Sequence, residues 1–313
     1  MRTIPTLALG LIGAALLAGC AGRPADAVAT VDAAAISRAD FAARLGTLIG
    51  NADVRAAIDA DDGARRRLEA GVLGHLVDAA LVTAGAKKLG VDINAPELQA
   101  HIDELVRTEL RGEPDAWRRF LDQRGYPEHE IRAQLREDLR REAVEERLLP
   151  DPVVPPERVA EVYQDQYVGR PIIRHILLAE EAQARRVLER LAAGEDFAAL
   201  ATELSLDTQT ARKGGNLGPH VEDAFVAPFE EAIENARDGH TVGPVQTPFG
   251  YHIIERRPPP ELTEVHGGIE ATLAEQLQDQ AFTRWLADLR TQADVDVDPD
   301  IGRWDAPSGT VLP

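Results

Sequence analysis

Several kinds of residue are scarce in this chain of 313 residues, and each scarcity excludes a class of protein. The single cysteine, Cys20, has no partner within the chain, so an intrachain disulfide, a four-cysteine zinc site and CxxC redox chemistry are excluded. Aromatic residues make up only 4% of the chain, and no loop of the GxxxxGK or GxGxxG type provides a nucleotide-binding motif. The sequence therefore predicts no cofactor.

Positive charge is scarce as well. The 34 lysine and arginine residues stand against 53 aspartate and glutamate residues, which gives a formal net charge of -19. Such a surface would repel a phosphate backbone over most of its area, so nucleic acid is not an expected partner. Apolar residues make up 44% of the chain, which is enough for buried cores, and the length is typical of about two domains.

The N-terminal segment has the layout of an export signal. Arg2 precedes an apolar run from Leu7 to Leu17, which is shorter than the roughly 20 residues that a membrane span needs. The run ends in Leu17-Ala18-Gly19-Cys20, which resembles the bacterial lipobox. The resemblance implies cleavage before Cys20, acylation of that cysteine and attachment to a membrane outside the cytoplasm. The alternative is a cleaved signal with an incidental cysteine.

The residue after the cysteine bears on which membrane holds the protein. Ala21 stands where an aspartate would retain a Gram-negative lipoprotein at the inner membrane. By that resemblance, we expect the periplasmic face of the outer membrane. Residues 1–19 are then the signal peptide and residues 20–27 a lipidated tether without periodicity.

Residues 28–167 have helical periodicity almost throughout. Ser37 is placed as the N-cap of a first helix. In the stretch from Leu68 to Leu81, two apolar stripes cover too wide an arc for a surface helix, so this helix is predicted to be central and buried. Further helices are predicted to begin near Asn94, Pro114, Pro127 and Glu157, and the proline-rich stretch 150–156 marks a boundary within this segment.

The pattern changes after Arg170. Short β-branched runs alternate with helical patches over residues 168–260, which predicts an α+β module of antiparallel sheet and helices. Residues 261–293 read as a long helix with an apolar stripe that needs a partner, and the N-terminal helices are the expected one. The fold class is therefore α+β: an all-helical domain with an inserted smaller domain. The acidic tail, residues 294–313, is expected to pack little.

Six motifs in residues 168–260 resemble the parvulin-type peptidyl-prolyl cis-trans isomerases, also called rotamases. They are RHIL (174–177), GEDFA (194–198), LSLD (204–207), KGGNLG (213–218), FEEA (229–232) and TPFGYHII (247–254). The helices before and after resemble, by order and pattern, the chaperone part of the SurA and PrsA foldases. With the lipobox, the overall plan resembles a PrsA-like lipoprotein.

The resemblance implies an active site built from four polar residues. His175 and His252 correspond to the family's paired histidines, and Thr247 to the hydroxyl group that orients them. Asp207 corresponds to a position where the family places cysteine or aspartate. Buried neutral histidines that donate to each other and to Asp207 would form a polar network.

The same resemblance assigns the substrate-binding residues. Leu217, Phe225 and Phe229 correspond to the apolar walls around the substrate's proline ring. Three positions depart from the usual pattern, because the family commonly has Met at 225, Asp at 216 and an aromatic residue at 219, where this chain has Phe225, Asn216 and Pro219. Phe225 keeps the wall apolar but narrows the space for the proline ring.

Other readings of the same residues are possible. Two histidines and an aspartate also suggest a metal site, but zinc would need a further ligand, and HExxH is absent. A Ser-His-Asp hydrolase would need an exposed nucleophile, and no GxSxG elbow occurs. Phe225 and Phe229 could be ordinary core residues. No role is assigned to the histidines at 75, 101, 220, 240 and 266.

The predicted function is that of a membrane-anchored, extracytoplasmic isomerase and chaperone that assists the folding of exported proteins. Its expected partners are unfolded or partly folded chains that contain X-Pro bonds, together with the membrane that holds the lipid anchor. The alternative is a holdase chaperone whose parvulin-like domain is inactive. An envelope scaffold lipoprotein is a third possibility.

Overall fold

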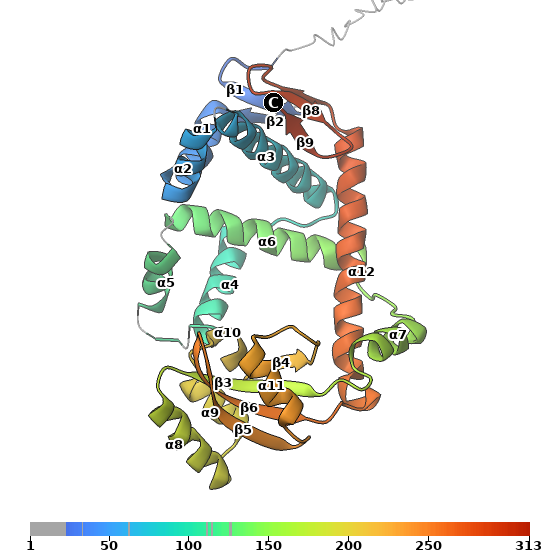
Figure 1. Ribbon diagram of the computed structural model, residues 1–313. Helices are drawn as coiled ribbons and strands as arrows, with labels where there is room; N and C mark the ends of the chain where they lie inside the picture. The colour runs from blue at the N-terminus through green and yellow to red at the C-terminus, as the bar shows by residue number, and fades with distance from the viewer. Residues whose placement is uncertain (1–22, 33, 62, 111, 114, 125–126) are drawn as a thin grey trace, which may run out of the picture. The chain divides into compact units, whose positions relative to one another are not determined.

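The computed structural model describes residues 23–313 apart from 33, 62, 111, 114 and 125–126, and it consists of two compact units (Figure 1). Unit 1 combines the chain up to Pro150 with Asp279–Pro313, and unit 2 is Asp151–Gln278. Unit 2 thus interrupts unit 1 in the sequence. It extends beyond the expected insert of 168–260 at both ends. Cys20, the predicted lipidation site, lies outside the described residues.

Helices dominate unit 1. Ser37 caps the first of them, because its Oγ accepts a hydrogen bond from the Asp40 N–H at 3.0 Å. The third is the predicted central helix: its length and apolar composition would suffice to cross a membrane, but Leu73 and Val77 are wholly buried in the unit. The helices are α1 (Arg38–Gly50), α2 (Ala52–Ala60), α3 (Ala64–Lys88), α4 (Ala95–Thr108), α5 (Ala116–Arg124), α6 (Glu128–Leu148) and the last part of α12 (Leu262–Gln292).

Unit 1 also contains strands that the sequence analysis missed, which corrects the description of this domain as all-helical. A three-stranded antiparallel sheet has the order β2-β1-β7, and β8 pairs with β9. These strands are β1 (Ala27–Val31), β2 (Ala34–Ser37), β7 (Val295–Val297), β8 (Arg303–Asp305) and β9 (Thr310–Leu312). The α+β class itself is confirmed.

Both ends of the described chain are therefore part of the fold. Ala27, the last residue of the predicted tether, is 1% exposed, and Arg23 forms ion pairs with Asp296 and Asp298. The prediction that the tail packs little is wrong, because Val311 lies in the same hydrophobic core as Leu73 of α3. Burial of the apolar residues in these short strands explains why they are ordered.

Unit 2 is built on a four-stranded antiparallel sheet with the order β4-β3-β6-β5. Along the chain, its elements are α7 (Pro156–Gln166), β3 (Ile172–Leu178), α8 (Glu181–Ala192), α9 (Phe197–Leu204), α10 (Thr208–Ala211), β4 (Asn216–Pro219), α11 (Ala227–Asn235), β5 (His240–Thr247), β6 (Gly250–Arg257) and the first part of α12. The expected succession of strands and helices is confirmed.

Each face of this sheet has its own apolar core, because successive residues of a strand point to opposite faces. On one face, Ile176 and Ile253 pack with residues of α8 and α9, among them Val187 and Leu200. On the other face, the neighbouring positions Ile173 and Ile254 pack against α11. We call these the α8/α9 face and the α11 face.

Helix α12 contributes to the cores of both units. In unit 2, its residues Ile269 and Leu273 pack with Val159 of α7. In unit 1, Phe282 packs with Ala86 and Val144. The expectation that this whole helix packs on the N-terminal helices is therefore correct only for its last part.

Candidate active site

The two histidines of the predicted site lie on neighbouring strands and on the α11 face. His175 is on β3 and His252 on β6, where His252 is paired in register with Leu177. Since Leu177 is two residues beyond His175, all three side chains point to the same face. The histidine rings stack with their centroids 5.4 Å apart, and His175 and His252 are 6% and 5% exposed.

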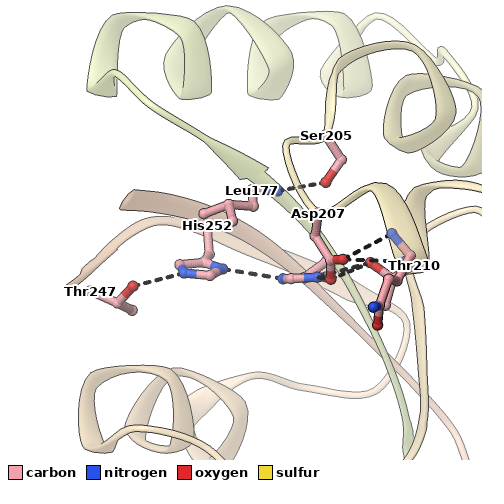
Figure 2. A network of polar contacts seen from close by, with 8 residues as sticks. Leu177, Ser205, Asp207, Thr210, Thr247 and His252 are labelled. Carbon is pink, nitrogen blue, oxygen red and sulfur yellow. Dashed lines mark hydrogen bonds and ion pairs between the residues drawn. The ribbon is translucent and has the colours of Figure 1, made fainter. Parts of the chain in front are cut away.

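A continuous series of hydrogen bonds runs through these rings (Figure 2). The Nδ1 atoms of His175 and His252 are 3.2 Å apart. At one end, Nε2 of His175 lies 2.9 Å from Oδ2 of Asp207. At the other end, Nε2 of His252 lies 2.8 Å from Oγ1 of Thr247. We call these four residues the polar network.

One arrangement of protons satisfies the whole network. An ionised Asp207 can only accept, so Nε2–H of His175 donates to it, and Nδ1 of that ring can accept. His252 then donates from Nδ1, and its Nε2 accepts from the Thr247 hydroxyl. The Thr247 oxygen in turn accepts from the N–H of Phe249 at 3.1 Å. His252 carries a single ring proton in this assignment, and its tautomer is assigned from its hydrogen-bond partners.

The pKa values agree with an ionised Asp207 and a neutral His252. Desolvation alone would raise the pKa of Asp207, but hydrogen bonds from Thr210 and His175 outweigh it and lower the pKa to about 2. The pKa of His252 is lowered to about 4, first by desolvation and then by the charge that His175 would carry if protonated. Near neutral pH the network therefore presents an uncharged imidazole at His252.

An apolar wall stands beside the network. It consists of Leu217, Phe225 and Phe229, which belong to one hydrophobic cluster on the α11 face. The Phe229 ring is edge-on to both imidazoles, with centroids 5.9 Å from His175 and 5.0 Å from His252. Its centroid is 4.9 Å from that of Phe225. The site thus combines an apolar surface with a buried, uncharged hydrogen-bonding network.

Every residue that the sequence placed in the active site is found in this arrangement. The four polar residues form the network, and the three apolar ones form the wall. Asn216, a departure from the family pattern, accepts a hydrogen bond from the Gly218 N–H at 2.8 Å within β4.

The sequence analysis overlooked Thr210. Its hydroxyl donates to Oδ2 of Asp207 at 2.7 Å and lies 3.1 Å from Nε2 of His175. Asp207 is the N-cap of α10 and accepts from the backbone N–H of Thr210 at 3.3 Å. The signal that could have revealed this residue is the three-residue spacing of a capping aspartate and a hydroxyl group.

Within the described residues, no group of three or more histidine, cysteine, aspartate or glutamate side chains is placed to hold a metal ion. The polar network contains three such residues, but their hydrogen bonds to one another use the nitrogen and oxygen atoms that a metal would need. This arrangement holds two imidazoles in fixed orientations beside an apolar surface.

Comparison with known families agrees with this geometry. Residues 178–257 match the model of the PPIC-type PPIase domain. The chain contains a PPIC-type PPIase domain. Residues 2–145 match the model of the SurA-like N-terminal domain, so the resemblance to parvulin-type isomerases and to SurA is confirmed. The PPIase match includes every predicted active-site residue except His175, which lies three positions before its start.

Individual relatives carry the name of a foldase. The foldase protein PrsA of Caldanaerobacter subterraneus subsp. tengcongensis is 45% identical over 102 residues, which are 32% of this chain and 33% of that protein. PrsA of Clostridium botulinum is 26% identical over 235 residues, 70% of both chains. The parvulin of Nitrosopumilus maritimus, a solved structure, is 40% identical, covers 28% of this chain and 95% of its own, and has a TM-score of 0.27. The chain spans between 33% and 57% of the first three curated relatives that it matches.

Proposed function

We propose that the protein is a peptidyl-prolyl cis-trans isomerase and chaperone, anchored by lipid outside the cytoplasm, that assists the folding of exported chains. The isomerase part rests on one observation: a buried network of two histidines, Asp207 and Thr247 lies directly against an apolar wall within a PPIC-type PPIase domain. His175, Asp207, Thr247 and His252 are the proposed catalytic residues. Leu217, Phe225 and Phe229 are proposed to bind the proline ring.

The chemistry needs no cofactor and no covalent step. Rotation about an X-Pro bond is opposed by amide resonance, which sets a barrier of about 18–20 kcal/mol and makes spontaneous exchange slow. Twisting the bond removes the resonance, so the twisted amide is less dipolar than the planar one. A site that binds the twisted amide better than the planar one lowers the barrier.

The geometry of the site suits that requirement. Phe229, with Phe225 and Leu217 beside it, offers an apolar surface that can hold the proline ring while the preceding residue turns. Because His252 is neutral, no full positive charge at that ring favours the more dipolar planar amide. The network fixes both imidazoles through Asp207 and Thr247, so the site is oriented before the substrate arrives.

A protease-coupled assay with proline-containing peptides tests the isomerase. The purified full chain should accelerate conversion of cis X-Pro peptide well above the spontaneous rate. A rate equal to that of the peptide alone would refute the proposal and leave the holdase alternative, in which the parvulin-like domain is inactive. Val187→Ala truncates a buried residue on the α8/α9 face, remote from the wall. It should isomerise the peptide at the wild-type rate, and it is the control for variants of the wall.

Chaperone activity is the second part of the proposal, and the match of residues 2–145 to the SurA-like N-terminal domain supports it. We expect the chain to suppress aggregation of an unfolded protein whether or not prolyl isomerisation is intact. The test compares wild type with Phe229→Ala in a light-scattering assay. Loss of suppression in this variant would mean that the two activities are not separable. No suppression by wild type would refute the chaperone part.

The anchor and the location rest on the lipobox-like sequence that ends at Cys20. We expect lipidation of Cys20 and, because Ala21 follows it, retention at the periplasmic face of an outer membrane. Cell fractionation of wild type and Cys20→Ala tests the anchor. The variant should move to the soluble extracytoplasmic fraction, and a variant that stays with the membrane would refute lipid anchoring.

The domain arrangement leads to a related proposal. The predicted division into a helical domain and an inserted PPIase domain is best tested with the observed boundaries of unit 2, Asp151–Gln278. We expect that a chain in which a short linker replaces these residues still folds into a helical protein with a cooperative melting transition. Aggregation or a loss of cooperativity would indicate that unit 1 depends on unit 2.

A further inference from the structure

A second histidine-carboxylate pair lies beside Phe225 of the apolar wall. Nε2 of His220 is 2.7 Å from Oε2 of Glu230, and the two side chains are only 15% and 13% exposed. His220 follows β4, and Glu230 lies in the first turn of α11. The sequence analysis assigned His220 no role, and the network around His175 and His252 does not include either residue.

Glu230 holds the backbone of the wall through its other oxygen. Its Oε1 accepts a hydrogen bond from the backbone N–H of Phe225 at 2.8 Å. One carboxylate therefore ties Phe225, on the loop between β4 and α11, to His220 at the start of the same loop. The backbone of His220 is fixed as well, because its N–H donates to the carbonyl oxygen of Pro171 at 2.8 Å.

The rings of the wall continue this set of contacts. The His220 imidazole lies nearly parallel to the Phe225 ring, at an interplanar angle of 7° and a centroid distance of 6.4 Å. Phe225 is 4.9 Å from Phe229, which is in turn edge-on to His252. Phe225 is thus held at its backbone by Glu230, on one side of its ring by His220, and on another by Phe229.

We propose that His220 and Glu230 are positioning residues that clamp Phe225 against Phe229. They thereby set the width of the space that the apolar wall leaves for the proline ring. This inference rests on the proposed isomerase function and deepens it. The occupant is the pyrrolidine ring of an X-Pro peptide, which a fixed wall binds without first ordering a side chain.

The clamp predicts a specific kinetic effect. Phe225 is part of the proposed ring-binding wall, where its ring packs against those of His220 and Phe229, so its displacement weakens the binding of planar and twisted amide alike. Such a change raises KM and leaves kcat nearly unchanged. We expect Glu230→Ala to raise KM for a short X-Pro peptide about fivefold, with kcat within about twofold of wild type.

A matched control separates this effect from general destabilisation. Glu255→Gln removes one charge of an ion pair of similar burial, in which Glu255 of β6 lies 3.0 Å from Arg174 of β3. The side chains of Arg174 and Glu255 are 14% and 21% exposed and lie on the α8/α9 face. We expect Glu255→Gln to lower the melting temperature comparably and to leave KM unchanged. Equal KM shifts in both variants, or an unchanged KM in Glu230→Ala, would overturn the clamp.

His220 provides a second test in case Glu230→Ala fails to fold. His220→Ala removes the stacked ring and should raise KM about threefold, whereas His220→Phe keeps a ring against Phe225 and should restore the wild-type value within about twofold. If His220→Phe binds the peptide as weakly as His220→Ala, the stacking contact does not position Phe225 and the proposal is wrong.

All these assays use the full chain in detergent and begin with wild type, so a failure of the proposed function can be distinguished from a failure of the clamp. If wild type does not accelerate isomerisation, the proposed function fails. The clamp is then tested by NMR, through the nuclear Overhauser effect between the rings of Phe225 and Phe229 in labelled protein. Glu230→Ala should weaken this effect, and Glu255→Gln should preserve it. An unchanged effect in Glu230→Ala would overturn the clamp.

Discussion

The two faces of the unit 2 sheet bury similar apolar residues but differ in the polar side chains that they bury. On the α8/α9 face, Ile176 and Ile253 pack among aliphatic and aromatic side chains. The α11 face has an equivalent core around Ile173 and Ile254, yet it also buries two histidines beside it. Burying polar groups lowers stability unless each is paired, so packing alone gives no reason for them. The difference between the faces is what locates the site.

The largest expected effects come from truncating one buried residue on each face. Leu200→Ala, on the α8/α9 face, should lower the free energy of unfolding by about 2–5 kcal/mol and leave kcat/KM of the folded protein unchanged. Phe229→Ala should fold but lose at least about tenfold in kcat/KM, which corresponds to about 1.4 kcal/mol of transition-state stabilisation. Melting curves and peptide kinetics measure both. A similar loss of activity in the two variants would erase the distinction between the faces.

The next effect concerns acid stability, to which His252 on the α11 face should contribute. Its pKa is lowered to about 4 from the ordinary 6.5, first by desolvation, so between these values the unfolded chain binds more protons than the folded one. Stability is therefore lost as pH falls from 6.5 to 4, by up to about 3 kcal/mol from this group. Urea unfolding at several pH values should show a shallower decline in His252→Gln. Identical pH dependence in both proteins would contradict a buried neutral His252.

A smaller effect is expected from Thr210. Hydrogen bonds from Thr210 help to lower the pKa of Asp207 to about 2 from 3.8, so this carboxyl group contributes stability that is lost as pH falls from 3.8 to 2. Thr210→Ala should reduce stability at pH 7 by about 1 kcal/mol and weaken the pH dependence in that acid range. Thr208→Ala, in the same short helix, is the control. Equal stability of the two variants would mean that Thr210 does not support Asp207.

The sequence allowed more to be predicted on the α11 face than in unit 1. His175 and His252 are far apart in the chain, but each lies within a motif of the parvulin-type family, so the resemblance paired them. Spacing alone could not, because strand register depends on contacts between distant segments. Thr210 was not predicted because a four-residue helix is too short to show a periodic pattern in the sequence.

The strands of unit 1 show the same limit more strongly. Ala27–Val31 is short and contains small residues, and Val295–Val297 alternates valine with aspartate. Neither pattern predicts a strand alone, because such short segments are stable only when paired. β1 pairs with the equally short β2 and with β7, and β7 is more than 250 residues away from β1 in the chain. The helices of this unit were predictable because capping residues such as Ser37 and apolar stripes act locally.

Catalysis of rotation about X-Pro bonds by the α11 face can be tested without a protease, by NMR exchange spectroscopy of a proline peptide at equilibrium. With catalytic amounts of the full chain, cis-trans exchange cross-peaks should appear at mixing times where the free peptide shows none. Phe229→Ala should weaken them at least about tenfold, and Leu200→Ala should not. An exchange rate with wild type equal to that of the free peptide would contradict catalysis by this face.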